Sequence, residues 1–167
     1  DEVLNSRTPF NRAVSKDYEP GSVYKVLTMA AALDSHTVTP ETVFVDTGVY
    51  VIGGISIHNW NWGAWGPQDM TGCLQHSLNV CLAWIADEMN PELFYSYMQN
   101  FGIGHLTGID LAGEVSGRLK VPGDEDWYES DLGTNSFGQG VAVTPVQMLM
   151  AVSALANDGQ MVTPHLL

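Results

Sequence analysis

Basic residues are scarce in this chain. Lysine and arginine together number 6, against 19 aspartates and glutamates, which gives a formal net charge of −13. A surface this acidic repels the phosphates of nucleic acids and the headgroups of anionic lipids, which argues against binding to either as a function. Many soluble domains are also acidic, and the charge alone therefore points to no partner.

Long apolar runs are absent as well. No uninterrupted apolar stretch approaches the roughly 20 residues that cross a bilayer, and no basic segment followed by an apolar one opens the sequence. With 167 residues, of which 45% are hydrophobic, the chain is long enough to bury one sizeable core. Its length predicts a single domain.

Cysteine is nearly absent, since Cys73 and Cys81 are the only two. If both lie in one helical stretch, their separation of 8 residues corresponds to roughly 12 Å, which is too far for a bond between them. We therefore predict two small buried hydrophobes, or at least one unpaired thiol. Cys73 and His76 share a helix face, but structural zinc sites close with four ligands, so a metal site is not expected.

The stretch from Glu19 to Lys25 places a hydroxyl and an amine one helical turn apart. Pro20 and Gly21 are unfavourable inside a helix and an almost wholly apolar run follows, so a buried helix is expected to begin near Ser22. Residues three apart share a helix face, which brings the two groups together. Burial lowers a lysine pKa, and a neutral amine accepts a proton from serine. Ser22 is the candidate nucleophile and Lys25 the candidate base.

A serine at a helix start is more often a cap than a nucleophile. A second polar motif weighs against that simpler interpretation, because Ser77-Leu78-Asn79 is the only Ser-x-Asn in the chain, as Ser22 to Lys25 is the only Ser-x-x-Lys. The pair matches the first two motifs of serine β-lactamases and penicillin-binding proteins. Ser77 and Asn79 lie within an apolar helical pattern, where polar groups need partners, and a local cap is their alternative role.

Further stretches carry a family-specific sequence. They are Asn11 to Val14, Tyr18 to Ser22, Phe101 to Gly104, Thr107 to Leu111 with Glu114 and Gly117, Ser136 to Gly140, Val143 to Met148, and Ala154 to Gly159. In these stretches and in the two serine motifs, the chain resembles the transpeptidase domain of class B penicillin-binding proteins over nearly its whole length. The resemblance implies an α/β fold of the serine β-lactamase and penicillin-binding transpeptidase type.

The resemblance also implies a reaction and a cellular location. Ser22 would attack the penultimate D-Ala carbonyl of a peptidoglycan stem peptide ending in D-Ala-D-Ala, with Lys25 as the base, and β-lactam antibiotics would acylate the same serine. Ser77 would help to pass a proton to the leaving group, and Asn79 would bind the substrate amide and Lys25. No metal or organic cofactor is implied. The implied location is the extracytoplasmic face of the bacterial plasma membrane, through an upstream anchor, among possible cell-wall assembly proteins.

The third motif of this family, Lys-Thr-Gly or a close variant, is missing. No lysine or arginine is followed by Thr-Gly or Ser-Gly. By resemblance, residues 1–167 are a partial transpeptidase domain: mostly the helical subdomain, with a short β-hairpin region and most of the central sheet missing. The isolated chain is expected to be inactive or very weak. Two alternatives stay open, a β-lactamase or β-lactam sensor of the same fold, and a non-catalytic helical module that binds partner proteins.

Local patterns predict the elements around these motifs. Helices are expected to pack around the helix that follows Ser22, with short strands only between Thr42 and His58 and a hairpin turn at Gly53-Gly54. One helix is expected from Asn90 to Gly102, and another from a capping box at Thr144 to the stop at Gly159. Glycine recurs without a period between these two helices, which predicts an irregular segment over residues 102–140.

Three tryptophans crowd one predicted loop. Trp60, Trp62 and Trp65 stand among asparagine and glycine between Asn59 and Gly66. Indoles offer flat apolar surface and an N–H donor, which would suit a wall facing a sugar or a peptide beside the cleft. Large aromatic side chains mostly serve burial, and we therefore favour a loop pinned onto the core by its tryptophans.

Overall fold

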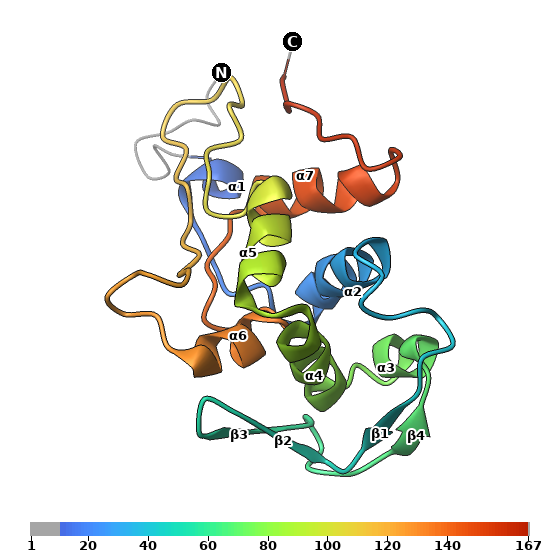
Figure 1. The fold of residues 1–167 in the computed structure, drawn as a ribbon. Helices are drawn as coiled ribbons and strands as arrows, with labels where there is room; N and C mark the ends of the chain where they lie inside the picture. The colour runs from blue at the N-terminus through green and yellow to red at the C-terminus, as the bar shows by residue number, and fades with distance from the viewer. Residues whose placement is uncertain (1–10, 167) are drawn as a thin grey trace.

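Helix α4 (Asn79–Met89) lies at the centre of the fold, between the strands and the other helices (Figure 1). The computed structural model describes residues 11–166, so residues 1–10 and 167 of the expected domain lie outside the described residues. The buried side chains of α4 are Val80, Cys81, Leu82, Ala83, Ile85, Ala86 and Met89. A helix that is apolar on most sides is stable only when other elements surround it, and this requirement organises the fold.

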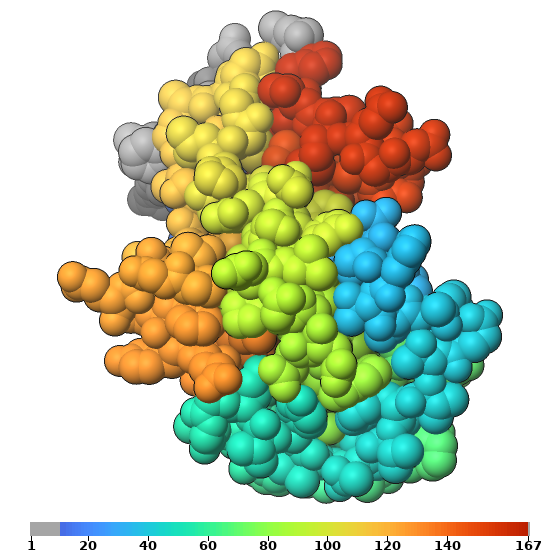
Figure 2. Space-filling view, viewed as in Figure 1, coloured from blue at the N-terminus to red at the C-terminus, as the bar shows by residue number. Residues whose placement is uncertain are grey.

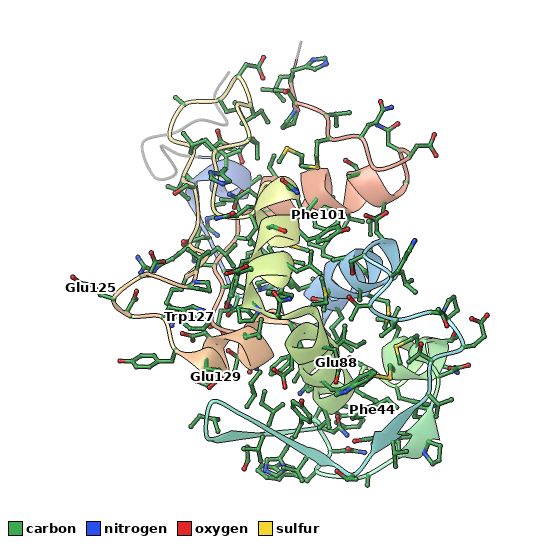
Figure 3. All side chains as sticks on the ribbon, in the orientation of Figure 1. Phe44, Glu88, Phe101, Glu125, Trp127 and Glu129 are labelled. Atoms are coloured by element: carbon green, nitrogen blue, oxygen red, sulfur yellow. A yellow bond between two sulfur atoms is a disulfide. The ribbon has the colours of Figure 1, made fainter. Side chains whose placement is uncertain are left out.

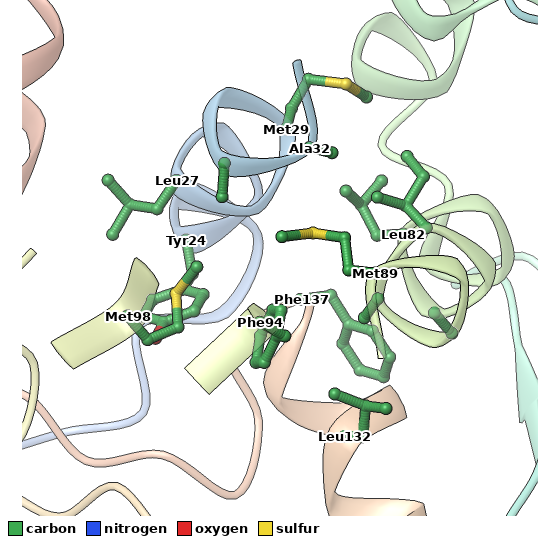
Figure 4. Packing of buried hydrophobic residues seen from close by; sticks show 14 of the residues in the cluster. Tyr24, Leu27, Met29, Ala32, Leu82, Met89, Phe94, Met98, Leu132 and Phe137 are labelled. Atoms are coloured by element: carbon green, nitrogen blue, oxygen red, sulfur yellow. The ribbon is translucent and has the colours of Figure 1, made fainter. Parts of the chain in front are cut away.

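The core forms where α2 (Lys25–Asp34), α5 (Pro91–Asn100) and α6 (Glu129–Asn135) pack against α4. Figure 4 shows apolar side chains that meet there: Tyr24, Leu27, Met29, Ala32, Leu82, Met89, Phe94, Met98, Leu132 and Phe137. Burying one large apolar side chain contributes about 1.5–3 kcal/mol relative to leaving it exposed, so the cluster holds these helices firmly together. Helices do pack against α2, the helix that follows Ser22, as predicted, but α4 and not α2 lies at the centre of the packing.

Four short strands form two separate antiparallel pairs. Strands β2 (Val49–Ile52) and β3 (Ile55–His58) make the hairpin predicted at Gly53-Gly54, where both glycines have positive φ. Strand β1 (Phe44–Asp46) pairs with β4 (Gly66–Gln68), which lies outside the predicted strand region. A Gly-Pro sequence is unusual for a strand and is tolerated here at a sheet edge. Within residues 11–166 there is no larger sheet, which confirms a mainly helical unit with short strands.

Two predicted helices are confirmed together with their caps. In α5 the Asn90 side chain accepts a hydrogen bond from the Leu93 N–H, and a proline opens the helix. Helix α7 (Pro145–Leu155) begins with the predicted capping box, in which the side chains of Thr144 and Gln147 bond reciprocally to the backbone. Both helix starts therefore follow from local chemistry that the sequence displays.

The prediction of an irregular segment over residues 102–140 is wrong at α6. This helix opens with an acidic first turn, and the Asp131 carboxylate accepts a hydrogen bond from the Tyr128 N–H. A glycine inside the helix hid the pattern, because glycine normally disfavours helix. Here Gly133 is needed, since a Cβ at that position would lie 2.4 Å from Ile57 Cδ1 and 2.5 Å from Ile52 Cγ2. The close approach of the β2–β3 hairpin explains the residue.

The remaining helices are short. Helix α1 (Arg12–Ser15) lies beside α7, as Figure 1 shows, and α3 (Met70–Gln75) precedes α4. A single 3-10 turn, η1 (Gly21–Tyr24), leads into α2. Among residues 11–166 no helix combines the length and the apolar character needed to span a bilayer.

The surface is acidic on one loop and apolar on one helix. Figure 3 shows Glu125 at the outer end of the loop before α6, pointing away from the core, whereas Trp127 donates from Nε1 to the Tyr95 hydroxyl (2.9 Å). On the face seen in Figure 2, the segment that includes α5 lies between α2 and this loop. Helix α7 exposes Leu149 (71% exposed) together with part of Val152 and Leu155.

A buried amide ties α7 to the irregular segment. Gln147 Oε1 accepts a hydrogen bond from the Thr144 N–H (2.7 Å). Gln147 Nε2 donates to the carbonyls of His105 (2.6 Å) and Ser116 (2.7 Å). Gln147 and Thr144 are fully buried, so the amide satisfies a backbone N–H that has no access to water and also joins α7 to two carbonyls of the irregular segment.

We expect Gln147→Leu to lower the free energy of unfolding by about 1–3 kcal/mol, because it leaves the Thr144 N–H unpaired in the interior and removes the bonds to the carbonyls of His105 and Ser116. Urea denaturation followed by circular dichroism measures the loss. The matched control is Gln99→Leu on the exposed side of α5, where a change of no more than about 0.5 kcal/mol is expected. Equal stabilities for the two variants would contradict the role of the Gln147 amide.

Candidate active site

Ser22 lies on the 3-10 turn η1, one residue after a glycine with positive φ. The α-helix itself begins at Lys25, so the helix expected near Ser22 starts as a tighter turn. This geometry leaves the Ser22 side chain exposed, while Tyr24 and Lys25 are buried. The hydroxyl is therefore accessible from solvent and the amine lies beneath the surface.

The four residues predicted from the sequence lie together. The Lys25 ammonium donates to the Ser77 carbonyl (2.7 Å), to Ser77 Oγ (3.0 Å) and to Asn79 Oδ1 (2.7 Å). Ser77 Oγ in turn donates to Ser22 Oγ (3.1 Å). The predicted convergence of the two hydroxyls and the amine is confirmed through Ser77, which lies between the other two, whereas the expected direct contact of Lys25 with the Ser22 hydroxyl is not among the hydrogen bonds described. The two contacts of Ser77 Oγ have distances suitable for proton transfer.

Burial shifts the proton affinity of Lys25. Its side chain is only 2% exposed, and desolvation of the charged form lowers its pKa from 10.5 to about 8. The ring of Phe137 lies 5.9 Å from Nζ, on the apolar side of the site. At a given pH near neutrality, a larger fraction of Lys25 than of an exposed lysine is therefore in the neutral form, which can accept a proton.

The predicted absence of a Cys73–Cys81 bond is wrong. The two residues form a disulfide, with their Cα atoms 6.0 Å apart. The distance expected from one continuous helix does not apply, because α3 ends at Gln75 and α4 begins at Asn79, with Ser77 at φ +53° between them. The turn brings one cysteine from each helix together. Neither cysteine is an unpaired thiol or a candidate metal ligand.

The segment of residues 136–140, for which the sequence predicted no contact, packs against the 3-10 turn η1. Residues 136–140 approach η1 so closely that a Cβ at Gly138 would lie 2.3 Å from the Gly21 carbonyl oxygen. The Gly21 N–H donates to the Gly138 carbonyl (2.9 Å), and Thr28 Oγ1 donates to the Ser136 carbonyl (2.8 Å). The sequence signals for this segment were its place in the family resemblance and the glycine in Ser-Phe-Gly, and neither showed which element it would contact.

Asn79 is one of the residues that line an open groove of about 300 Å³. Strand β3, the tryptophan loop and residues 134–139 supply its other walls. The favoured interpretation of the tryptophan loop is wrong for two of the three rings, because Trp60 is 70% and Trp62 is 76% exposed. Trp65 is stacked on His76 with ring centroids 4.0 Å apart, and Trp62 touches the ring of His58 (4.3 Å) while most of its surface stays exposed. The exposed indoles form a wall of the groove.

The lining of the groove carries no acidic residue and no lysine or arginine, in a chain whose net charge is −13. Within residues 11–166 no three His, Cys, Asp or Glu side chains gather as a metal ion would require. The chemistry available at this site is that of a hydroxyl, an amine and an amide beside an uncharged aromatic groove.

We expect Lys25 in the folded chain to titrate at about pH 8, which NMR of its ε-carbon measures directly. The matched control is the chain unfolded in urea, where the same residue should titrate near 10.5. Because the folded value is the lower one, the unfolded state binds more protons between these pH values. The contribution of Lys25 to the free energy of unfolding therefore increases with pH across that window. A value near 10.5 in the folded chain would contradict the burial of the amine.

Known proteins are similar to this chain in sequence and in fold. Residues 4–167 match the family model for the penicillin binding protein transpeptidase domain. Penicillin-binding protein PbpB of Mycolicibacterium smegmatis is 36% identical over 158 residues, which cover 94% of this chain and 24% of that protein. Peptidoglycan D,D-transpeptidase MrdA of Escherichia coli is 34% identical over 180 aligned residues, covering 99% and 28%.

A solved structure is also similar. The crystal structure of penicillin binding protein 3 from Mycobacterium tuberculosis, complexed with aztreonam, matches with a TM-score of 0.84 and 32% identity, covering 93% of this chain and 34% of that one. The chain spans about a quarter of the length of the two curated relatives. With a family match that extends over residues 4–167, the chain belongs to the transpeptidase domain family of penicillin-binding proteins.

Proposed function

We propose that the protein is a peptidoglycan-cross-linking serine D,D-transpeptidase that forms an acyl-enzyme on Ser22. The observation that carries this proposal is the continuous hydrogen-bonded path from Ser22 Oγ through Ser77 Oγ to the Lys25 amine. An exposed nucleophile joined to a buried base of lowered pKa is the arrangement that activates a serine. The name of the relative MrdA, a peptidoglycan D,D-transpeptidase, supports the same reaction.

The proton path follows from these contacts. When Lys25 is neutral, its amine takes the proton of Ser77 Oγ while Ser77 takes the proton of Ser22, and the Ser22 oxygen attacks the carbonyl carbon. The ammonium formed is stabilised by the Ser77 carbonyl and Asn79 Oδ1. On collapse of the tetrahedral intermediate, the proton returns through Ser77 to the leaving amine. Ser77 thus serves both proton transfers.

The substrate in this proposal is a peptidoglycan stem peptide ending in D-Ala-D-Ala. Attack at the penultimate D-Ala carbonyl breaks its amide bond, leaves the acyl group on Ser22 and releases the terminal D-Ala. An amine from a neighbouring strand then takes the acyl group. Asn79 binds the substrate amide in the groove that it lines. β-Lactams acylate Ser22 as substrate mimics, and the similar penicillin binding protein 3 was crystallised with aztreonam.

We place the reaction at the extracytoplasmic face of the bacterial plasma membrane, where cell-wall assembly proteins are possible partners. The Cys73–Cys81 disulfide supports this location, because disulfides persist in oxidising compartments and are rare in the cytosol. The family membership supports it as well, since its substrate is the cell wall.

We expect incubation with benzylpenicillin to give a persistent covalent adduct on the wild-type sequence in a longer chain that also carries the Lys-Thr-Gly strand, which intact-protein mass spectrometry detects. Ser22→Ala should abolish the adduct, whereas Ser35→Ala, a hydroxyl removed from the opposite end of α2, should leave it unchanged. An adduct that survives Ser22→Ala would refute the nucleophile. Rapid release of hydrolysed penicillin would favour a β-lactamase, and no adduct on wild type after prolonged incubation would favour a non-catalytic interaction module.

We also propose that the chain is a partial catalytic domain that lacks the Lys-Thr-Gly strand. In the family that strand supplies one oxyanion donor and binds the substrate carboxylate, and losing a single such donor costs about 10²- to 10³-fold in rate. Labelling with fluorescent penicillin is therefore expected to be at least roughly 10³-fold slower than in a longer chain that includes the sheet strands and this motif. Equal labelling rates in the two chains would show that residues 1–167 lack nothing essential.

A further inference from the structure

The Cys73–Cys81 disulfide brackets the turn that carries Ser77 and Asn79. We propose that this disulfide is a positioning element, which holds the carbonyl and the hydroxyl of Ser77 at the Lys25 ammonium. The catalytic meaning of this role rests on the function proposed above. Both cysteines act through Ser77, so they are positioning residues and take no part in bond making.

The turn has an unfavourable backbone that needs support. Ser77 has φ +53°, a left-handed conformation that residues other than glycine, asparagine and aspartate rarely adopt. The Ser77 N–H donates to the Leu74 carbonyl (3.0 Å), and the Leu78 N–H donates to the Cys73 carbonyl (2.9 Å). Both acceptors belong to the last turn of α3. The conformation of Ser77 therefore depends on where α3 ends, and the disulfide fixes that end against α4.

Helix α3 has few other anchors. It contains six residues, and helices of this length are unstable unless tertiary contacts hold them. Its buried residues are Met70, Gly72 and Cys73, so the cysteine is one of only three. Helix α4 is instead buried along most of its length. Opening the disulfide thus releases α3 and the turn, while α4 stays in the core.

Ser77 and Asn79 should respond differently. Asn79 is the first residue of α4, and its Nδ2 donates to the His58 carbonyl (3.1 Å), which holds it against strand β3. Ser77 bonds only through the turn, to Lys25 and to Ser22 among the contacts described. Two of the three acceptors of the Lys25 ammonium are on Ser77. These two are the contacts that the disulfide controls.

The double variant Cys73→Ala/Cys81→Ala tests the proposal, with the Lys25 pKa read from NMR of its ε-carbon. If Ser77 moves away, water replaces both of its acceptor atoms and relieves the desolvation, so the pKa should rise from about 8 by roughly one unit. Amide hydrogen exchange at Ser77 and Leu78 should become at least about tenfold faster, with the amides of α4 beyond its first turn unchanged. The native chain reduced with a phosphine should behave in the same way.

A matched control separates positioning from general loss of stability. Gln147→Leu is destabilised at α7, far from the turn in sequence and in contacts, and its Lys25 should still titrate at about pH 8. A Lys25 pKa that stays at about 8 in the folded double variant would overturn the proposal. So would unfolding of both the double variant and the reduced chain, since the disulfide would then brace the whole fold.

The readouts do not depend on catalysis. If Lys25 shifts as expected but wild-type Ser22 forms no penicillin adduct, the positioning role stands and the proposed function fails. If Ser22 is acylated but Lys25 is unaffected by loss of the disulfide, the proposed function stands and the positioning role fails. The two conclusions are therefore tested separately.

Discussion

The buried ammonium of Lys25 is the constraint on which the surrounding structure depends. A charged group that is 2% exposed is stable only when polar atoms replace its water, and three acceptors from residues 77 and 79 do so here. Those acceptors come from a sharp turn between two helices, so the turn can relax only if water takes their place at the ammonium. The break between α3 and α4 thus serves to solvate one lysine.

The same constraint explains why distant parts of the sequence meet here. Helix α2 supplies Lys25, the α3–α4 turn supplies its acceptors, and residues 136–140 close the other side of η1 through the Gly21–Gly138 contact. Each segment is anchored in the common core through its own apolar side chains. The core therefore sets the distances between the polar groups, which is the preorganisation that the proposed proton transfer requires.

The sequence predicts best where local chemistry decides the structure. The start of α5 at Asn90 and the capping box at Thr144 were visible because each cap satisfies its own helix. The convergence of Ser22, Lys25 and Ser77 could be predicted because the Ser-x-x-Lys and Ser-x-Asn motifs contain these three side chains. By contrast, the sequence could not reveal α6, whose Gly133 is explained only by the neighbouring hairpin. The disulfide was missed because a distance calculated for one continuous helix does not hold where the helix breaks. The exposure of Trp60 and Trp62 was missed because it depends on how the loop packs against the rest of the fold.

The apolar side of α7 has a consequence for how molecules of this protein behave toward one another. Leu149 and its neighbours offer a short-range attraction between copies, because apolar area withdrawn from water is favourable on contact. The net charge of −13 opposes it through repulsion that reaches about 10 Å in 0.1 M salt and less at higher concentrations. Screening weakens the repulsion and leaves the attraction intact. The ionic strength of the medium therefore shifts the balance between charge repulsion and apolar attraction when two chains meet.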